Sequence, residues 1–168
     1  RKELKSLNIE KEPINFSVVL DNKYIDGIFD RHKVRLAVAG HKYNMEKGID
    51  YKEVFSPAPN QNTTRKLTAM AVKMGLSRMA WDIKLAYCWA DIPDGRLIAL
   101  RYPKGYERTR KNEDGTTEEE FIVLRKNCYG LPSAGKAWSK HIDKYMLEEF
   151  NKNGYKCTQC QYDPCLFY

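Results

Sequence analysis

Long apolar runs are missing from this 168-residue sequence. The longest, Leu85 to Ala90, has six residues, whereas a membrane-spanning helix needs roughly 20. The opening residues, RKELK, contain neither the apolar core of a signal peptide nor an initiator Met. We therefore expect an intracellular chain that is not secreted, although the sequence does not specify its compartment. We also expect the N-terminus to be cut from a longer protein.

Cysteine is also scarce. The five cysteines are an odd number and do not resemble the dense disulfide framework of a small secreted domain, so free thiols in a reducing compartment are the simpler interpretation. Cys157, Cys160 and Cys165 resemble part of a zinc site. Because such a site normally has four ligands, and no His or Cys follows Cys165, we do not expect metal there and leave any other role of these thiols open.

The composition is that of a folded domain, with 42% hydrophobic and 12% aromatic residues. The 29 Lys and Arg outnumber the 22 Asp and Glu, which leaves a net charge of +7. This balance favours a polyanionic partner such as nucleic acid or an anionic lipid surface. Charge alone does not choose between them.

A β-hairpin is predicted near the N-terminus. Apolar and β-branched residues mark strands at 16–20 and 33–38, and Asp26-Gly27 is a turn signal between them. Since side chains alternate along a strand, Lys33 and Arg35 should share a basic face. The opposite face, which we expect to pack, carries Val34, Leu36 and Val38.

The remaining pattern mixes helices and strands. A helix capped at Asn62 or Thr63 and ending at Gly75 should turn a stripe toward the core, formed by Leu67, Met70, Ala71 and Met74. A second helix is predicted over 134–150 and closed by Gly154, with one side formed by Trp138, Ile142, Tyr145, Met146 and Phe150. Other predicted segments are a helical tail at 1–7, strands at 78–83, 97–102, 121–124 and 162–168, and a solvated hairpin loop at 104–120. Without regular strand–helix alternation, the fold class predicted is α+β.

Asp82 lies in the predicted buried strand MAWDIK, an apolar context that would normally exclude a carboxylate. A bound divalent cation is one way to compensate the cost of burying it. The alternative is an aspartate that caps a helix opening near Leu85. Considered by itself, this residue favours capping.

Four strings change that balance because they occur together in order and spacing. They are RHKVRLAVAGHKY after Asp26-Gly27, GIDYKEVFSP at 48–57, WDIKLAYCWADI at 81–92 and CYGLPSAGKAW at 128–138, followed by the closing YDPCLF. Together they resemble the reverse transcriptase of copia-type long-terminal-repeat retrotransposons, and the similarity extends from about Leu4 to the last residue. Four collinear strings make a chance match improbable.

The resemblance implies a right-hand polymerase fold and a single reverse-transcriptase-like domain over 1–168. In that fold the fingers would comprise roughly 14–76 and 104–150, and the palm roughly 77–103 and 151–168. The implied activity is RNA-directed DNA synthesis from nucleoside triphosphates on an RNA or DNA template and primer.

The resemblance also implies site residues. Asp82 matches the first catalytic aspartate, which with the carbonyl oxygen of Ile83 would help to hold two Mg²⁺ ions for phosphoryl transfer. Tyr87 matches an aromatic residue that lies under the sugar and excludes a ribose 2′-hydroxyl. From the residue pattern alone, a core aromatic side chain is the better interpretation of Tyr87.

Two further groups match nucleotide-binding positions. Lys33 and Arg35 match the basic fingers strand that grips the triphosphate, although two solvated cations are about as compatible with the pattern. Gly130, Leu131 and Lys136 match the segment that borders nucleotide and template, where glycine permits close backbone approach. The alternative is a loop and cap that lead into the following helix.

The sequence departs from the family pattern at two points. Ser133 stands where relatives usually carry Gln, and the Tyr-x-Asp-Asp hairpin with the remaining carboxylates, expected just after Tyr168, is absent. We therefore expect this chain alone to be inactive. Two hypotheses follow: a fragment of an RNA-directed DNA polymerase, or a domesticated transposon domain that serves as a non-catalytic structural subunit among protein partners.

Overall fold

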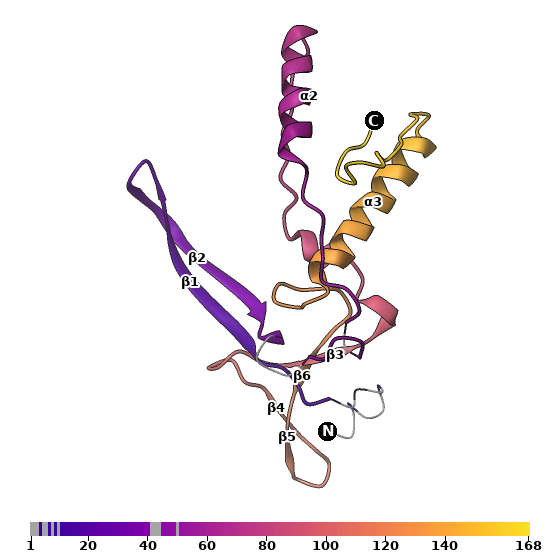
Figure 1. Ribbon diagram of the computed structural model, residues 1–168. Helices are drawn as coiled ribbons and strands as arrows, with labels where there is room; N and C mark the ends of the chain where they lie inside the picture. The colour runs from indigo at the N-terminus through magenta and orange to yellow at the C-terminus, as the bar shows by residue number, and fades with distance from the viewer. Residues whose placement is uncertain (1–3, 5–6, 8, 10, 41–44, 50) are drawn as a thin grey trace.

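A computed structural model describes residues 4, 7, 9, 11–40, 45–49 and 51–168 (Figure 1). The predicted helical tail at 1–7 falls mostly outside these residues. Helices and antiparallel strands are mixed, as the α+β prediction requires. None of the helices in the described part of the chain is long and apolar enough to cross a membrane.

A small sheet lies at the centre of the molecule. Strands β3 (Ile98–Arg101) and β6 (Phe121–Leu124) pair antiparallel, close to the predicted positions. Ile14 extends the sheet by a parallel bridge to Leu100, with its N–H donating to the carbonyl of Ala99 at 2.9 Å. Ile14 thus occupies the place of a third strand, beside β3.

Both faces of this sheet are covered by apolar side chains. One face is formed by Leu100 with Ile98, Ile122 and Leu124, and it packs in a core with Ile14, Val38, Leu131 and Ala134. The other face, formed by Ala99, Phe121 and Val123, packs against Leu4 and Ile9. Because side chains alternate between the two faces of a strand, these two short strands contribute apolar residues to both cores.

The predicted N-terminal hairpin is confirmed as β1 (Phe16–Ile25) and β2 (Ile28–Val38), joined at Asp26-Gly27. Its residues share faces as predicted. The expectation that the apolar face packs against a core holds only for Val38 and is wrong for the two apolar residues before it. Val34 and Leu36 are 60% and 45% exposed. The hairpin projects from the sheet, so only its base reaches the core (Figure 1).

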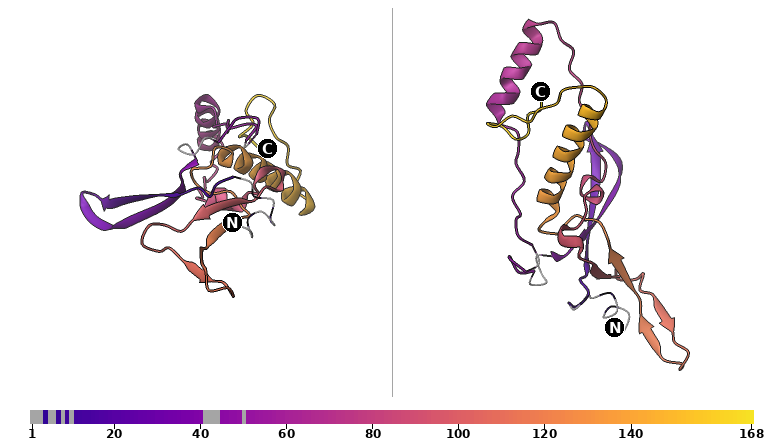
Figure 2. Two further views of the ribbon diagram at one scale, coloured as in Figure 1. Left: turned by 90° about the horizontal axis from the view of Figure 1, so that it is seen from below. Right: turned by 90° about the vertical axis from the view of Figure 1, so that its right-hand side faces the viewer.

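The predicted loop at 104–120 is a second projecting hairpin (Figure 2). Its strands, β4 (Thr109–Lys111) and β5 (Thr117–Glu119), pair antiparallel, with Arg110 opposite Glu118. Arg101 anchors the base of this hairpin through Glu119 at 3.7 Å, and also lies 3.4 Å from Glu12.

The first long helix is α2 (Gln61–Lys73), and its N-cap lies two residues before Asn62, the first predicted cap. Asn60 is the N-cap, and its side chain accepts the N–H of Asn62 at 2.9 Å. The helix buries no residue, so its apolar stripe does not face a core as predicted: Leu67, Met70 and Met74 are all exposed. Figure 1 shows α2 at one end of the molecule, away from the central sheet.

Two predicted strands are not found. Residues 78–83 have no regular secondary structure and are exposed, and 162–168 contain only a bridge from Phe167 to Gln159. A strand is stabilised by backbone hydrogen bonds to a neighbour, and no described strand pairs with 78–83. Two 3₁₀ helices follow it, η2 (Ala86–Trp89) and η3 (Pro93–Gly95).

The last helix, α3 (Ala134–Lys152), confirms the prediction for 134–150. Gly154 follows it with φ of 82°, a left-handed conformation that glycine adopts readily at a helix end. Most of the predicted apolar side is half-buried, whereas Tyr145 is exposed.

Candidate functional site

The loop before α3 docks on the base of the β1–β2 hairpin. The N–H of Val38 donates to the carbonyl of Tyr129 at 2.6 Å. Gly130 has φ of 91°, and a Cβ atom there would overlap the carbonyl oxygen of Val38 and lie 2.9 Å from its nitrogen. The close approach that requires glycine at position 130 is thus an approach to Val38. A nucleotide contact by Gly130 stays a prediction.

The same loop also contacts the 3₁₀ helix η2. The rings of Tyr87 and Tyr129 lie 4.9 Å apart between centroids, tilted by 58°. Tyr87 is half-buried and packs against the core around Val38 and Leu131. This agrees with the core-aromatic alternative, and its proposed role beneath a sugar stays a prediction.

A buried amide that the sequence analysis did not single out joins η2 to this loop. Asn127 is 1% exposed; its side chain donates to the carbonyl of Asp91 at 2.6 Å and accepts from the hydroxyl of Ser133 at 3.3 Å. Its backbone N–H donates to Ala90 at 2.9 Å. The sequence offered one indication of this residue: Asn127 is a polar residue between the apolar strand at 121–124 and the CYGLP string.

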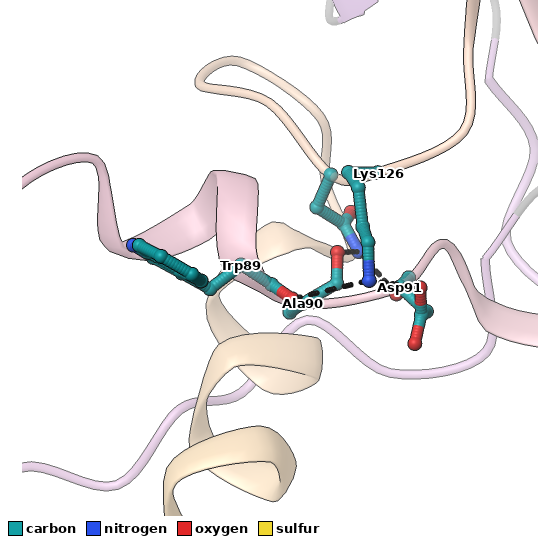
Figure 3. Close-up of polar contacts among 5 residues, drawn as sticks. Trp89, Ala90, Asp91 and Lys126 are labelled. Atoms are coloured by element: carbon teal, nitrogen blue, oxygen red, sulfur yellow. Dashed lines mark hydrogen bonds and ion pairs between the residues drawn. The ribbon is translucent and has the colours of Figure 1, made fainter.

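Beside Asn127, an exposed ion pair reinforces the junction. The ammonium group of Lys126 bonds to the carboxylate of Asp91, and their backbones form an antiparallel bridge (Figure 3). The contact with Lys126 holds the pKa of the Asp91 carboxyl below its usual value. The end of η2 is therefore tied to the loop by an exposed pair and a buried amide.

Asp82 lies outside this junction. It sits in the exposed segment between α2 and η2 and makes no hydrogen bond or ion pair with the described residues. The expectation of a buried strand around it is wrong, and so is the capping alternative: Leu85 occupies the N-cap of η2, without any side-chain cap. Ile83, the predicted second metal contact, is 43% exposed.

Metal ligands do not gather in the described part of the chain. No group of three or more His, Cys, Asp or Glu side chains there is arranged to hold an ion. Two Mg²⁺ ions need several oxygen ligands, and Asp82 brings only one carboxylate. The described residues therefore do not fit a two-metal centre by themselves.

The predicted cations lie on two elements. Lys33 and Arg35 occupy the exposed polar face of β2, where Lys33 is paired in register with Asp21 and Arg35 lies 3.8 Å from the same carboxylate. Lys136, in the first turn of α3, lies 3.3 Å from Glu53. Leu131 is buried in the core.

The structure brings together the segments that carry most of the predicted residues. Gly130 lies against Val38, the last residue of the strand that carries Lys33 and Arg35, and Tyr87 and Leu131 pack in the core that contains Val38. An exposed basic strand thus leads directly into an aromatic pair. Cations that are exposed in this way can bind phosphate oxygens, and an aromatic face can contact a sugar or base.

Comparison with known proteins gives one family. The family described as "Reverse transcriptase (RNA-dependent DNA polymerase)" matches residues 3–162. The chain is 28% identical over 138 residues to the Retrovirus-related Pol polyprotein from transposon TNT 1-94 of Nicotiana tabacum, which covers 82% of the chain and 9% of that relative. It is 30% identical over 123 residues to the corresponding polyprotein from transposon RE1 of Arabidopsis thaliana, which covers 73% of the chain and 8% of that relative.

These comparisons confirm the predicted resemblance to a retrotransposon reverse transcriptase. The chain spans less than a tenth of the length of these relatives. Neither relative's name describes a structural subunit, so the second hypothesis gains no support. No solved structure matches the chain.

Proposed function

The chain belongs to the reverse transcriptase (RNA-dependent DNA polymerase) family, and on that premise we propose that it is part of a copia-type enzyme that copies a template into DNA from deoxynucleoside triphosphates. The relatives are Pol polyproteins more than ten times as long as the matched segment, so polymerisation is proposed for the whole protein. We assign 14–76 and 104–150 to the fingers and 77–103 and 151–168 to the palm of a right-hand fold.

The observation that supports this proposal is the convergence at Val38. Three strings that resemble the family are far apart in the sequence, yet the basic strand, η2 and the CYGLP loop meet through Val38, Tyr129 and Tyr87. Core packing thus places the basic strand next to the aromatic pair, so that one nucleotide could contact both groups.

Within this proposal each group has a distinct role. Lys33 and Arg35 bind the triphosphate oxygens of the incoming nucleotide, and the planar guanidinium group of Arg35 is suited to two oxygens at once. Tyr87 lies under the sugar and excludes a 2′-hydroxyl. Gly130, Leu131 and Lys136 form the border with nucleotide and template. These cations attract a polyanionic template and primer as well.

Members of this family generally use a divalent metal. Asp82 and the carbonyl oxygen of Ile83 would be ligands for Mg²⁺, and the ion would supply positive charge beside the phosphates. Because one carboxylate falls short of the ligands that two ions need, we expect these 168 residues not to extend a primer by themselves. In the whole enzyme, other carboxylates would complete the site.

Primer extension by the parent protein tests the proposal. Asp82→Asn should reduce the rate of nucleotide addition by more than about a hundredfold, since removal of a central catalytic group costs at least that much. Binding of the template and primer should persist because the cations remain. Asp94→Asn is the matched control: Asp94 is also exposed, makes an ion pair with Lys52 at 3.4 Å, and has no proposed role.

Two results would contradict the proposal. If the parent protein binds template and primer but adds no nucleotide with Mg²⁺, the enzymatic function is wrong. If Asp82→Asn and Asp94→Asn extend primers equally well, the assignment of Asp82 is wrong.

A further inference from the structure

Two cysteines meet at the junction between η2 and the loop that follows β6. Cys88 belongs to η2 and Cys128 opens the CYGLP string, 40 positions later. The two thiols lie close enough to interact electrostatically, and the interaction with Cys88 contributes to a raised pKa of the Cys128 thiol. Both residues are half-buried, and Cys128 packs against the core around Val38.

Contacts on either side of the pair hold the two backbones together. On one side the rings of Tyr87 and Tyr129 lie 4.9 Å apart. On the other side the N–H of Asn127 donates to the carbonyl of Ala90 at 2.9 Å. A disulfide requires Cα atoms within about 7 Å and converging Cβ atoms. Contacts on both sides of the pair hold the two segments against each other, as such a bond needs.

We propose that Cys88 and Cys128 form a redox-modifiable pair that closes to an intramolecular disulfide on reaction with a small disulfide such as oxidised glutathione. This inference does not depend on polymerase activity.

The exchange has two balanced steps. The thiolate of Cys88 attacks one sulfur of oxidised glutathione, which forms a mixed disulfide and releases one reduced glutathione. The thiolate of Cys128 then attacks the Cys88 sulfur and expels the second glutathione. Two protein thiols are oxidised, one glutathione disulfide is reduced, and the two thiol protons pass to the departing glutathione thiolates.

The order of the steps follows from the surroundings of Cys128. Burial raises the pKa of its thiol, so little of it is thiolate at neutral pH and it is the poorer first nucleophile. Once Cys88 carries glutathione, the second step is intramolecular. The resulting bond would fasten η2, with Tyr87, to the loop that carries Tyr129.

The other three cysteines provide an internal comparison. Cys157, Cys160 and Cys165 all lie in the segment after α3. Burial, together with the nearby carboxylates of Asp163 and Asp143, raises the pKa of Cys165, which disfavours its thiolate. No contact between the thiols of this segment and those of the junction is found among the described residues, so the two groups should react separately.

The test is oxidation of the complete 168-residue chain in oxidised glutathione, followed by alkylation of the remaining thiols and peptide mass spectrometry. We expect a cross-linked peptide joining Cys88 to Cys128, which dithiothreitol reverses, and a midpoint of thermal unfolding several degrees higher in the oxidised chain. Cys88→Ser should abolish both effects. Cys157→Ser, the matched control, should retain both.

Either of two outcomes would overturn the proposal. One is persistent glutathionylation or full alkylation at Cys88 and Cys128 with no cross-link between them. The other is a dominant disulfide elsewhere, within the C-terminal segment or between two chains. Because the wild-type chain alone decides between these results, the test stands even if a variant folds poorly, and no polymerase assay enters it.

Discussion

Asp163 accepts a hydrogen bond from the backbone N–H of Asn60, 103 positions earlier in the chain, at 3.0 Å. Asn60 is the N-cap of α2. Asp163 is 5% exposed and belongs to the YDPCLF string. The C-terminal segment therefore fastens the start of a helix that buries no residue of its own.

Acid should release this contact. Hydrogen bonds from Thr63, Asn60 and Cys165 hold the pKa of the Asp163 carboxyl below its usual value of 3.8. A depressed pKa stabilises the fold fully above the usual value and loses that contribution as the pH falls through the lower, folded-state pKa. Hydrogen-exchange protection of the first turn of α2 should therefore fall in acid and should already be several-fold lower in Asp163→Asn at neutral pH.

Asp114 is the matched control for that experiment. Its carboxylate accepts hydrogen bonds from Thr116, and these lower its pKa too, but the contacts stay within the turn between β4 and β5. Asp114→Asn should leave the exchange of α2 unchanged. Equal protection of α2 in wild type and Asp163→Asn would show that the carboxylate does not fasten the helix.

Replacement of Gly130 by alanine should strongly destabilise the chain. The new Cβ would overlap Val38, and forced overpacking costs about 1–3 kcal/mol, to which the left-handed backbone adds about 1 kcal/mol. Gly115→Ala isolates the second cost, because φ is 82° there and a Cβ would meet nothing within 4 Å. Urea unfolding should show Gly130→Ala to be less stable than Gly115→Ala by about 2 kcal/mol. Equal losses would mean that the loop moves away from Val38 at little cost.

Lys126 and Asn127 both contact the chain at the end of η2, but they should contribute very differently to the free energy of unfolding. Asn127→Ala leaves the carbonyl of Asp91 and the buried hydroxyl of Ser133 without their partner, which costs about 1–3 kcal/mol in the free energy of unfolding. Lys126→Ala removes an ion pair whose side chains are both largely exposed, and such pairs contribute little. Urea unfolding compares the two variants. A larger loss from Lys126→Ala would mean that the exposed pair, and not the buried amide, holds the junction.

Sequence patterns predicted the elements that local interactions determine. The Asp26-Gly27 turn, the alternating strands beside it and the helix over 134–150 can be identified because turn chemistry and periodicity act within a few residues. The strand predicted at 78–83 failed because pairing depends on a distant neighbour that no local pattern reveals. The stripe on α2 failed similarly: periodicity shows which residues share a face, but not whether anything covers that face.

In the candidate site too, features set by local patterns could be predicted, whereas contacts between distant segments could not. The basic face of β2 follows from alternation, so Lys33 and Arg35 could be placed together from the sequence. The docking of Gly130 on Val38 could not be predicted. A glycine in a motif indicates that another segment comes close, but the motif does not identify that segment. Asn127 was missed because an isolated asparagine has no periodic signature, and only its burial gives its hydrogen bonds their importance.

Arg35 should matter more to nucleotide binding than another arginine on the same strand. Arg35 and Arg31 share the polar face of β2, but Arg35 is closer to Val38, where the proposed site lies, and Arg31 is near the tip beside Asp30 at 3.6 Å. Arg35→Gln should raise the KM of the parent protein for deoxynucleoside triphosphates by about ten- to a hundredfold, since a lost charged hydrogen bond costs about 1.5–3 kcal/mol, and should change kcat less. Arg31→Gln removes the same charge from the same face, so equal effects would indicate general attraction of the polyanion, whereas an effect confined to Arg35 would support a triphosphate site at the base of the hairpin.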